Sequence, residues 1–127
     1  MSLHNYVGKI GEDLAREYLE KRGYKVLEHN YRTKYAEIDL VCEKSAGFLG
    51  MGKPILVFVE VRTKIGEDFG APEETINRAK LRRVRKNALA YAAFKKRKGL
   101  LRLDAICIVL KPDFSILRMN HYENLSG

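Results

Sequence analysis

Apolar residues recur at helical spacing near the start of the chain and again in its second half. Over residues 7–22 they stand three and four positions apart, which predicts an amphipathic helix that Gly23 ends. A second long helix is predicted to begin at Pro72, because proline suits a first helical turn and Glu73 and Glu74 follow it. Its inner stripe would hold one lysine among apolar residues: Ile76, Lys80, Val84, Ala88 and Tyr91.

Shorter apolar runs bounded by turn signals predict the strands. These runs cover residues 24–31, 36–43, 55–61 and 101–110, with an edge strand over 116–121. Glycines predict a flexible connection over 44–53 and a loop over 65–71. At 127 residues with 46% apolar content, the chain fits a single α/β domain over 1–127.

Acidic residues interrupt two of these otherwise buried strands. A charged group removed from water costs several kcal/mol unless it is paired or binds a metal, so Asp39 and Glu60 are candidates for a cation site. An extended chain puts Glu37 and Asp39 on one face and Ile38 and Leu40 on the other. Two like charges on one face therefore need a partner.

Basic groups fall where they could meet these carboxylates. Arg62 and Lys64 share a strand face with Glu60, and Lys80 stands on the inner stripe of the second helix. Glu12, on the first helix, lies near the buried edge and can reach the sheet. The alternatives are cross-strand ion pairs for Glu60 and Arg62, solvent exposure for Glu12, and a lysine that only snorkels from the core for Lys80.

Charge is concentrated in one segment. The chain carries a net charge of +8, and residues 78–98 hold ten basic residues and no acidic one. The rest has fourteen basic and sixteen acidic residues, a net of −2. A local basic surface favours contacts with phosphates, although a solvated helix face is the simpler alternative.

Cysteine usage and the amino terminus bear on the compartment. Cys42 and Cys107 stand in apolar runs without metal-ligand spacing, so we expect two small core residues. The first residues lack the regions of a signal peptide, and no apolar run reaches the length of a membrane span. The sequence predicts a soluble cytoplasmic protein with no membrane partner.

The order of elements and motifs resembles the YraN-like family of small bacterial proteins, within the PD-(D/E)xK (restriction endonuclease-like, Holliday junction resolvase-like) nuclease superfamily. The segments that carry the resemblance are Gly8-Lys9-Ile10-Gly11-Glu12, Gly23-Tyr24, Asn30-Tyr31-Arg32, Glu37-Ile38-Asp39-Leu40, Phe58-Val59-Glu60-Val61-Arg62, Phe69-Gly70 with Pro72, Lys80, and Arg102-Leu103-Asp104. Each is weak alone, but the ordered set is specific. The resemblance implies a central mixed sheet of four or five strands flanked by helices, in the order α-β-β-β-α-β.

The same resemblance implies a metal site. It assigns Asp39 and Glu60 as the acidic pair, the Val61 carbonyl as a further ligand and Glu12 as a completing group. Mg²⁺ or Mn²⁺ suits such oxygen ligands, whereas the scattered histidines do not suit zinc. Arg62 stands where the motif has lysine, and arginine is a poor proton acceptor, so Lys64 or Lys80 would supply the amine. Asp104 is expected to pair with a basic group.

These residues lead to three hypotheses. The first is a metal-dependent endonuclease-like protein acting on DNA, with branched or irregular DNA as a substrate class. The second is a non-catalytic nucleic-acid-binding module that keeps the nuclease fold, and the third is a protein-interaction domain with an acidic partner. A homodimer is a further arrangement to test. Backbone contacts to nucleic acid are expected from the basic helix: Arg78, Arg82, Arg83, Arg85 and Lys86.

Overall fold

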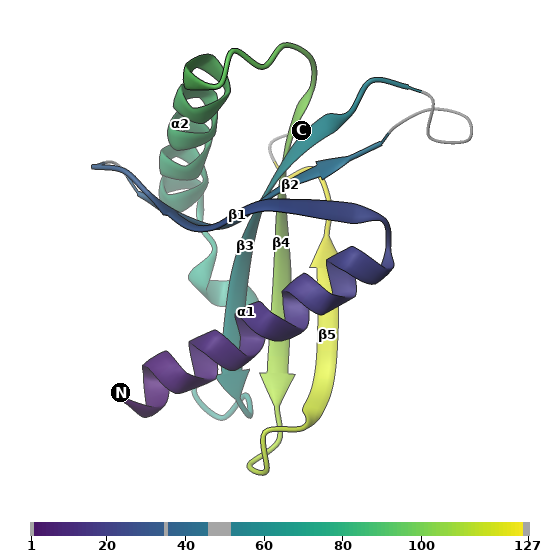
Figure 1. Cartoon of the computed structure of the whole chain (residues 1–127). Helices are drawn as coiled ribbons and strands as arrows, with labels where there is room; N and C mark the ends of the chain where they lie inside the picture. Colours follow the sequence, from purple (N-terminus) through teal and green to yellow (C-terminus); the bar gives the residue numbers. More distant parts are fainter. Residues whose placement is uncertain (1, 35, 46–51, 126–127) are drawn as a thin grey trace.

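Five strands form one mixed sheet in chain order, with α1 across one face and α2 against the other (Figure 1). The computed structural model describes residues 2–34, 36–45 and 52–125. The predicted connection over 44–53 lies largely outside these residues. The elements are α1 (Leu3–Lys21), β1 (Tyr24–Arg32), β2 (Glu37–Lys44), β3 (Ile55–Ile65), the 3₁₀ helix η2 (Pro72–Thr75), α2 (Arg78–Phe94), β4 (Leu101–Leu110) and β5 (Ile116–Tyr122).

Strand direction divides the sheet into a meander and a crossover. β1, β2 and β3 pair antiparallel in sequence, and β5 pairs antiparallel with β4. β3 and β4 are parallel, so the chain between them returns through η2 and α2. The predicted α/β order with a mixed sheet is confirmed, and the predicted edge strand supplies the fifth strand.

Each face of the sheet has its own apolar core. Beneath α1, Ala15 and Leu19 pack on residues of β2, β3, β4 such as Val59. Beneath α2, Val84 and Tyr91 pack on a cluster with Phe58. Both cysteines are buried and free, as predicted. Neither helix of the described chain has the length and apolar content that crossing a bilayer requires.

The predicted long helix from Pro72 is wrong in its beginning. Pro72 opens η2, in which the Glu74 carboxylate accepts the Ala71 N–H at 2.6 Å, and Ile76 is then extended. α2 starts only after Asn77, whose side chain accepts the Lys80 N–H at 2.9 Å. Proline and acidic residues mark the start of any helical turn, so the pattern did not separate η2 from α2.

Three smaller differences concern element boundaries. α1 begins at Leu3 because the Ser2 hydroxyl caps it by accepting the Asn5 N–H. Ile65, predicted as loop, is the last residue of β3 and pairs with Leu110 of β4. In β1 buried and exposed residues do not alternate regularly, because its register with β2 shifts between Val26 and Glu28.

Candidate active site

The site begins where β2 and β3 separate. Their antiparallel pairing runs from Lys44 opposite Ile55 to Leu40 opposite Val59, and Asp39 is the next residue of β2. Instead of continuing the ladder through its backbone, Asp39 uses its side chain: Oδ2 accepts the Val61 N–H at 2.8 Å. This bond fixes the carboxylate between the two strands. The N–H and C=O of one strand residue point to the same neighbour, so the Val61 carbonyl also faces this edge.

The expected alternation along β2 fails at this point. Leu40 packs in the core beneath α1, but Ile38 packs beneath α2 with Phe58. The prediction that Ile38 and Leu40 share a face is therefore wrong. The residues of β2 that precede Leu40 do not pair with β3. Their side chains therefore need not follow the pleat of the rest of the sheet.

Three carboxylates from two elements meet here. Glu12 of α1 and Glu37 and Asp39 of β2 each offer an oxygen, and these oxygens all lie within 4.8 Å of one another. The prediction that Glu12 reaches the sheet is thus confirmed. Glu37, noticed in the sequence as a second charge but not assigned as a ligand, belongs to this cluster.

Asn30 was not predicted as a site residue. With its amide nitrogen turned to the carboxylates, it donates to the two oxygens of Glu12 at 3.1 and 3.2 Å and to Glu37 at 3.0 Å. Its backbone is left-handed, with φ of 51°, a conformation that asparagine tolerates better than most residues. The Asn30-Tyr31-Arg32 segment of the family pattern was the available signal.

Glu60 faces two cations. Its Oε2 accepts from Arg62 Nη2 at 3.1 Å and lies 3.4 Å from Lys80 Nζ, while the whole residue is only 2% exposed. Its second oxygen, Oε1, and the Arg62 Nε are buried and have no hydrogen-bond partner among the described residues. The snorkelling alternative for Lys80 is excluded, because its amine lies beside a buried carboxylate.

Lys64 is directed elsewhere. Its Nζ donates to the carbonyl oxygens of Phe69 and Gly70, each at 3.4 Å. Of the two lysines left open by the sequence, Lys80 therefore stands beside Glu60 and Lys64 supports the loop after β3. Asp104 is also apart from the acidic cluster, since it pairs with Arg102 at 2.9 Å and with His121 at 2.8 Å. This pairing confirms the expectation for Asp104.

Burial and neighbouring negative charge raise the pKa values of Glu12, Asp39 and Glu60. Burial, then Asp39 and Glu37, raise the pKa of Glu12 to about 7. Burial raises the pKa of Asp39 to about 6, although the hydrogen bond from the Val61 N–H acts to lower it. Burial and the charge of Asp39 raise the pKa of Glu60 to about 8. Without a cation these shifts disfavour the ionised forms of the three groups, and a bound cation would favour them.

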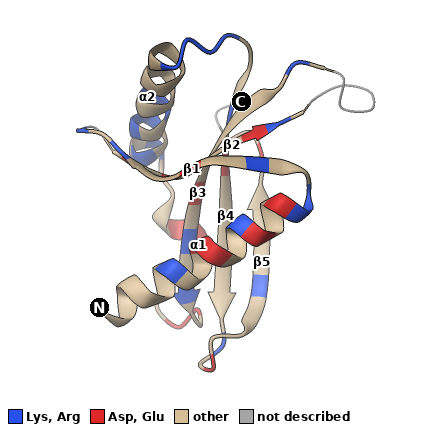
Figure 2. Cartoon of the chain, in the orientation of Figure 1, with Lys and Arg blue, Asp and Glu red and all other residues tan. Residues whose placement is uncertain are grey.

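A cleft of about 370 Å³ joins the carboxylates to the basic helix. Its walls come from β2 and the residue before it, β3 and α2: Ala36, Glu37, Asp39, Glu60, Arg62, Lys80, Arg83 and Val84. The other predicted nucleic-acid contacts, Arg78, Arg82, Arg85 and Lys86, are exposed on the same helix as Arg83. Figure 2 shows the basic bands along α2 and in the segment that follows it.

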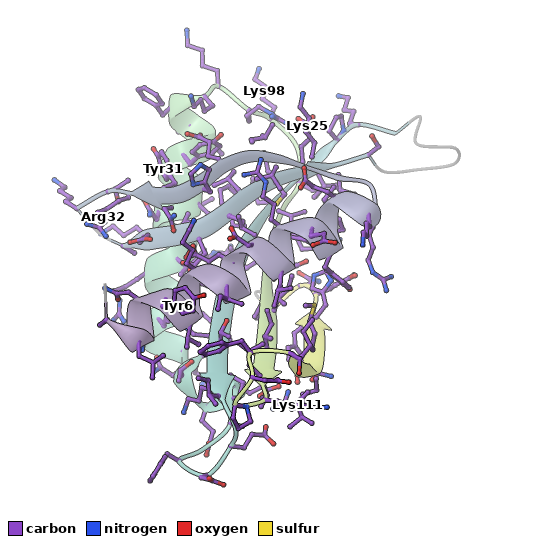
Figure 3. All side chains as sticks on the ribbon, turned by 60° about the horizontal axis from the view of Figure 1, so that its bottom comes forward. Tyr6, Lys25, Tyr31, Arg32, Lys98 and Lys111 are labelled. Atoms are coloured by element: carbon purple, nitrogen blue, oxygen red, sulfur yellow. The ribbon has the colours of Figure 1, made fainter. Side chains whose placement is uncertain are left out.

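The tip of the β1–β2 hairpin is fastened beside this cleft. Asn87, fully buried in α2, accepts from the Thr33 hydroxyl at 2.7 Å and donates to the Ala36 carbonyl at 2.9 Å. Arg32 lies at the hairpin tip (Figure 3) and pairs with Glu37 at 2.7 Å. α2 therefore positions the hairpin that carries two members of the acidic cluster.

Comparison with known proteins identifies the family. A model of the family described as "Uncharacterised protein family UPF0102" matches residues 11–108. A UPF0102 protein of Syntrophomonas wolfei is 43% identical over 89 residues, 70% of each chain. Those of Dictyoglomus thermophilum and Flavobacterium psychrophilum are each 35% identical, covering 93% and 98% of this chain and 94% and 96% of their own. The chain belongs to the UPF0102 family, which confirms its YraN-like resemblance.

Proposed function

We propose that this UPF0102 protein is a metal-dependent endonuclease-like protein that hydrolyses phosphodiester bonds in DNA, with branched or irregular DNA as its substrate class. One observation carries the proposal. Three carboxylates converge within 4.8 Å in a region that also holds Arg62 and Lys80 and lies against an exposed basic helix. Anionic ligands for a cation and cationic donors for a phosphate thus stand side by side.

The acidic cluster fits Mg²⁺ or Mn²⁺. These ions favour carboxylate and carbonyl oxygens as ligands. Each of the three carboxylates offers an oxygen, and these oxygens all lie within 4.8 Å of one another. Glu12, Glu37 and Asp39 would hold the ion, with the Val61 carbonyl at the same edge. Glu60, whose Oε1 has no hydrogen-bond partner among the described residues, would be a further ligand.

The chain's own groups divide the remaining work. A bound divalent cation lowers the pKa of a coordinated water and neutralises phosphate charge. The Arg62 guanidinium lines the cleft beside the carboxylates, which suits it to orient a phosphate oxygen. The Lys80 amine, 3.4 Å from Glu60, is placed to hold or release a proton near the attacking water.

The test is a nicking assay on duplex and branched DNA with Mg²⁺ or Mn²⁺. Asp39→Asn retains an oxygen for the Val61 N–H but removes the charge, so we expect activity to fall more than about 100-fold while DNA binding survives. Asp113→Asn, in the β4–β5 turn, is the matched control and should keep full activity. Unchanged nicking by the Asp39 variant would contradict the assignment of Asp39 to the metal site.

A non-catalytic nucleic-acid-binding module is the second candidate. The observation that favours it is the pairing of Glu60 with both Arg62 and Lys80, which occupies one of its carboxylate oxygens. This candidate predicts salt-dependent binding to nucleic acid but no turnover under any metal condition. Turnover that Asp39→Asn abolishes would exclude it.

A further inference from the structure

We infer that the groove beside the acidic cluster binds an unpaired nucleobase next to the phosphate under attack, with Phe69 as its stacking surface. This inference rests on the proposed function and specifies its substrate class. The groove would select DNA in which at least one nucleotide near the phosphate lacks a paired partner. It adds a recognition element from α1 and the loop after β3 to the basic helix.

The groove lies between the first half of α1 and the end of β3, elements that meet at one end of the sheet (Figure 1). Its volume of about 520 Å³ is within the range of small-molecule sites. Its lining is mainly apolar and includes Leu3, Val7, Gly8, Phe69 and Pro72. An aromatic base suits such a lining better than a phosphate does.

The groove is continuous with the acidic site. Glu12, Asp39 and Arg62 also line it, and two of them, Asp39 and Arg62, line the cleft that faces the basic helix. A phosphate held by Arg62 would therefore have the acidic cluster on one side and the apolar groove next to it. The base attached to that nucleotide is the ligand whose position matches the groove.

Phe69 is presented to solvent by a loop that is held in place. The side chain of Phe69 is 98% exposed, so its ring is accessible to a ligand in the groove. Lys64 binds the carbonyls of Phe69 and Gly70, and Arg118 binds Glu67 on the same loop. Arg118 also pairs with Glu73 of η2 at 2.7 Å, which ties the loop's far end to β5.

This arrangement pre-organises an aromatic surface for stacking. The backbone of the loop that carries Phe69 is already held in place, so binding orders only the ring itself and more of the contact appears as affinity. Stacking of a base on an aromatic side chain contributes about 1–3 kcal/mol and does not depend on which base is present. A base inside a duplex is already stacked on its neighbours and cannot enter the groove without being extruded.

The experiment compares two DNA duplexes that differ only in a short single-stranded end. One end carries normal nucleotides and the other carries abasic sugars, so their phosphates are the same. Affinity is measured by fluorescence anisotropy in Ca²⁺, an oxygen-ligated cation that neutralises the acidic cluster. We expect the normal end to bind about 5- to 150-fold more tightly than the abasic end.

Phe69→Ala should remove this difference while leaving affinity for the abasic end unchanged, and Phe69→Tyr should restore it. The matched control is Phe94→Ala, because Phe94 is also exposed, at 76%, but ends α2 away from the groove. It should keep the full preference. Since Phe69 is exposed, its variants are expected to retain the wild-type melting temperature.

Two results would overturn the inference alone: equal wild-type affinity for the two ends, or a preference that persists in Phe69→Ala. In both cases the protein still binds DNA, so the proposed function would stand. Binding to neither duplex would instead contradict the proposed function and this inference together.

Discussion

Glu60 interacts with both cationic side chains of the site and with the neighbouring carboxylate of Asp39. It is buried beside Asp39, and its pKa of about 8 lies well above the usual value for a glutamate. Arg62 and Lys80 each approach Oε2, but they do not outweigh burial and the neighbouring negative charge. When no cation is bound, ionisation of Glu60 is unfavourable, because it puts a buried negative charge beside Asp39.

This imbalance predicts a pH-dependent effect of Glu60→Gln on stability. Without metal, the folded protein holds a proton on Glu60 that the unfolded chain releases, so wild-type stability falls as pH rises from about 4.5 to about 8. Glutamine removes this linkage. The free energy of unfolding of the variant, relative to wild type, should therefore rise between pH 5 and pH 8 by an amount on the order of a few kcal/mol.

The measurement is denaturant unfolding of both proteins in EDTA at several pH values. Parallel stability curves for the two proteins would contradict the elevated pKa. In Mn²⁺ the wild-type protein should instead be more stable than Glu60→Gln, because the carboxylate of Glu60 can bind the cation and the amide of glutamine cannot.

Sequence reasoning selected residues that the structure brings together in one cleft where the residue type was unusual for its position. Asp39 and Glu60 were identified because charge inside a strand is costly, and Lys80 because it interrupts an apolar stripe. Asn30 was missed because its role depends on a left-handed backbone at the end of β1. The role of Lys64 stayed undecided, because the alternation of side chains along a strand predicts only the face on which a residue lies. The loop carbonyls that its amine contacts are not visible in the sequence.

At the level of elements, the contact between α1 and β3 sets the position of Glu12. Gly11 of α1 is buried on β3, where an added Cβ would lie 1.7 Å from Thr63 Oγ1. The helix can approach the strand this closely only without a side chain there. The neighbouring residue, Glu12, is thereby brought to the carboxylates of β2.

Gly11→Ala is therefore expected to destabilise the protein by about 1–3 kcal/mol, because α1 must move away from the sheet. The same shift should weaken metal binding through Glu12. Gly8→Ala is the matched control on the same helix, since its Cβ would meet no atom within 4 Å. It should stabilise α1 by up to about 1 kcal/mol through helix propensity. Thermal melting of the two variants checks this, and equal melting temperatures would contradict the close contact.

Elements were predictable to the extent that their signals were local. Helical periodicity, together with apolar runs bounded by turn signals, located both helices and all five strands, because core packing imposes these patterns. The break between η2 and α2 was missed because it depends on the Asn77 cap competing with a continuous helix. The change of face at Ile38 was missed because it follows from where β2 and β3 stop pairing, which is a tertiary property.

For the whole molecule, the excess positive charge lies on one helix and in the segment after it, next to the cleft (Figure 2). Both candidate functions use this surface for phosphate contacts. Counterion release then makes the logarithm of affinity fall linearly with the logarithm of salt concentration. The slope measures how many phosphates the surface neutralises.

Replacing Arg82 and Lys86 with alanine should reduce this slope by about 1.8, or about 0.9 for each lost contact with B-form DNA. Replacing the exposed Lys21 and Lys111 with alanine changes the net charge by the same amount. These two lysines lie outside the basic helix α2, so the slope should stay at its wild-type value. Anisotropy titrations over a range of salt concentrations give both slopes. Equal slopes for the two double variants would mean that α2 does not contact DNA, and a salt-insensitive interaction would count against both candidate functions.

The central claim is that Glu12, Glu37 and Asp39 form a divalent-cation site beside Arg62 and Lys80. The most direct test is a crystal structure with Mn²⁺, measured at the manganese absorption edge. We expect an anomalous peak among the three carboxylates, which Asp39→Asn removes and Asp113→Asn retains. Well-ordered carboxylates without a peak between them, at a manganese concentration that occupies other sites, would contradict the claim.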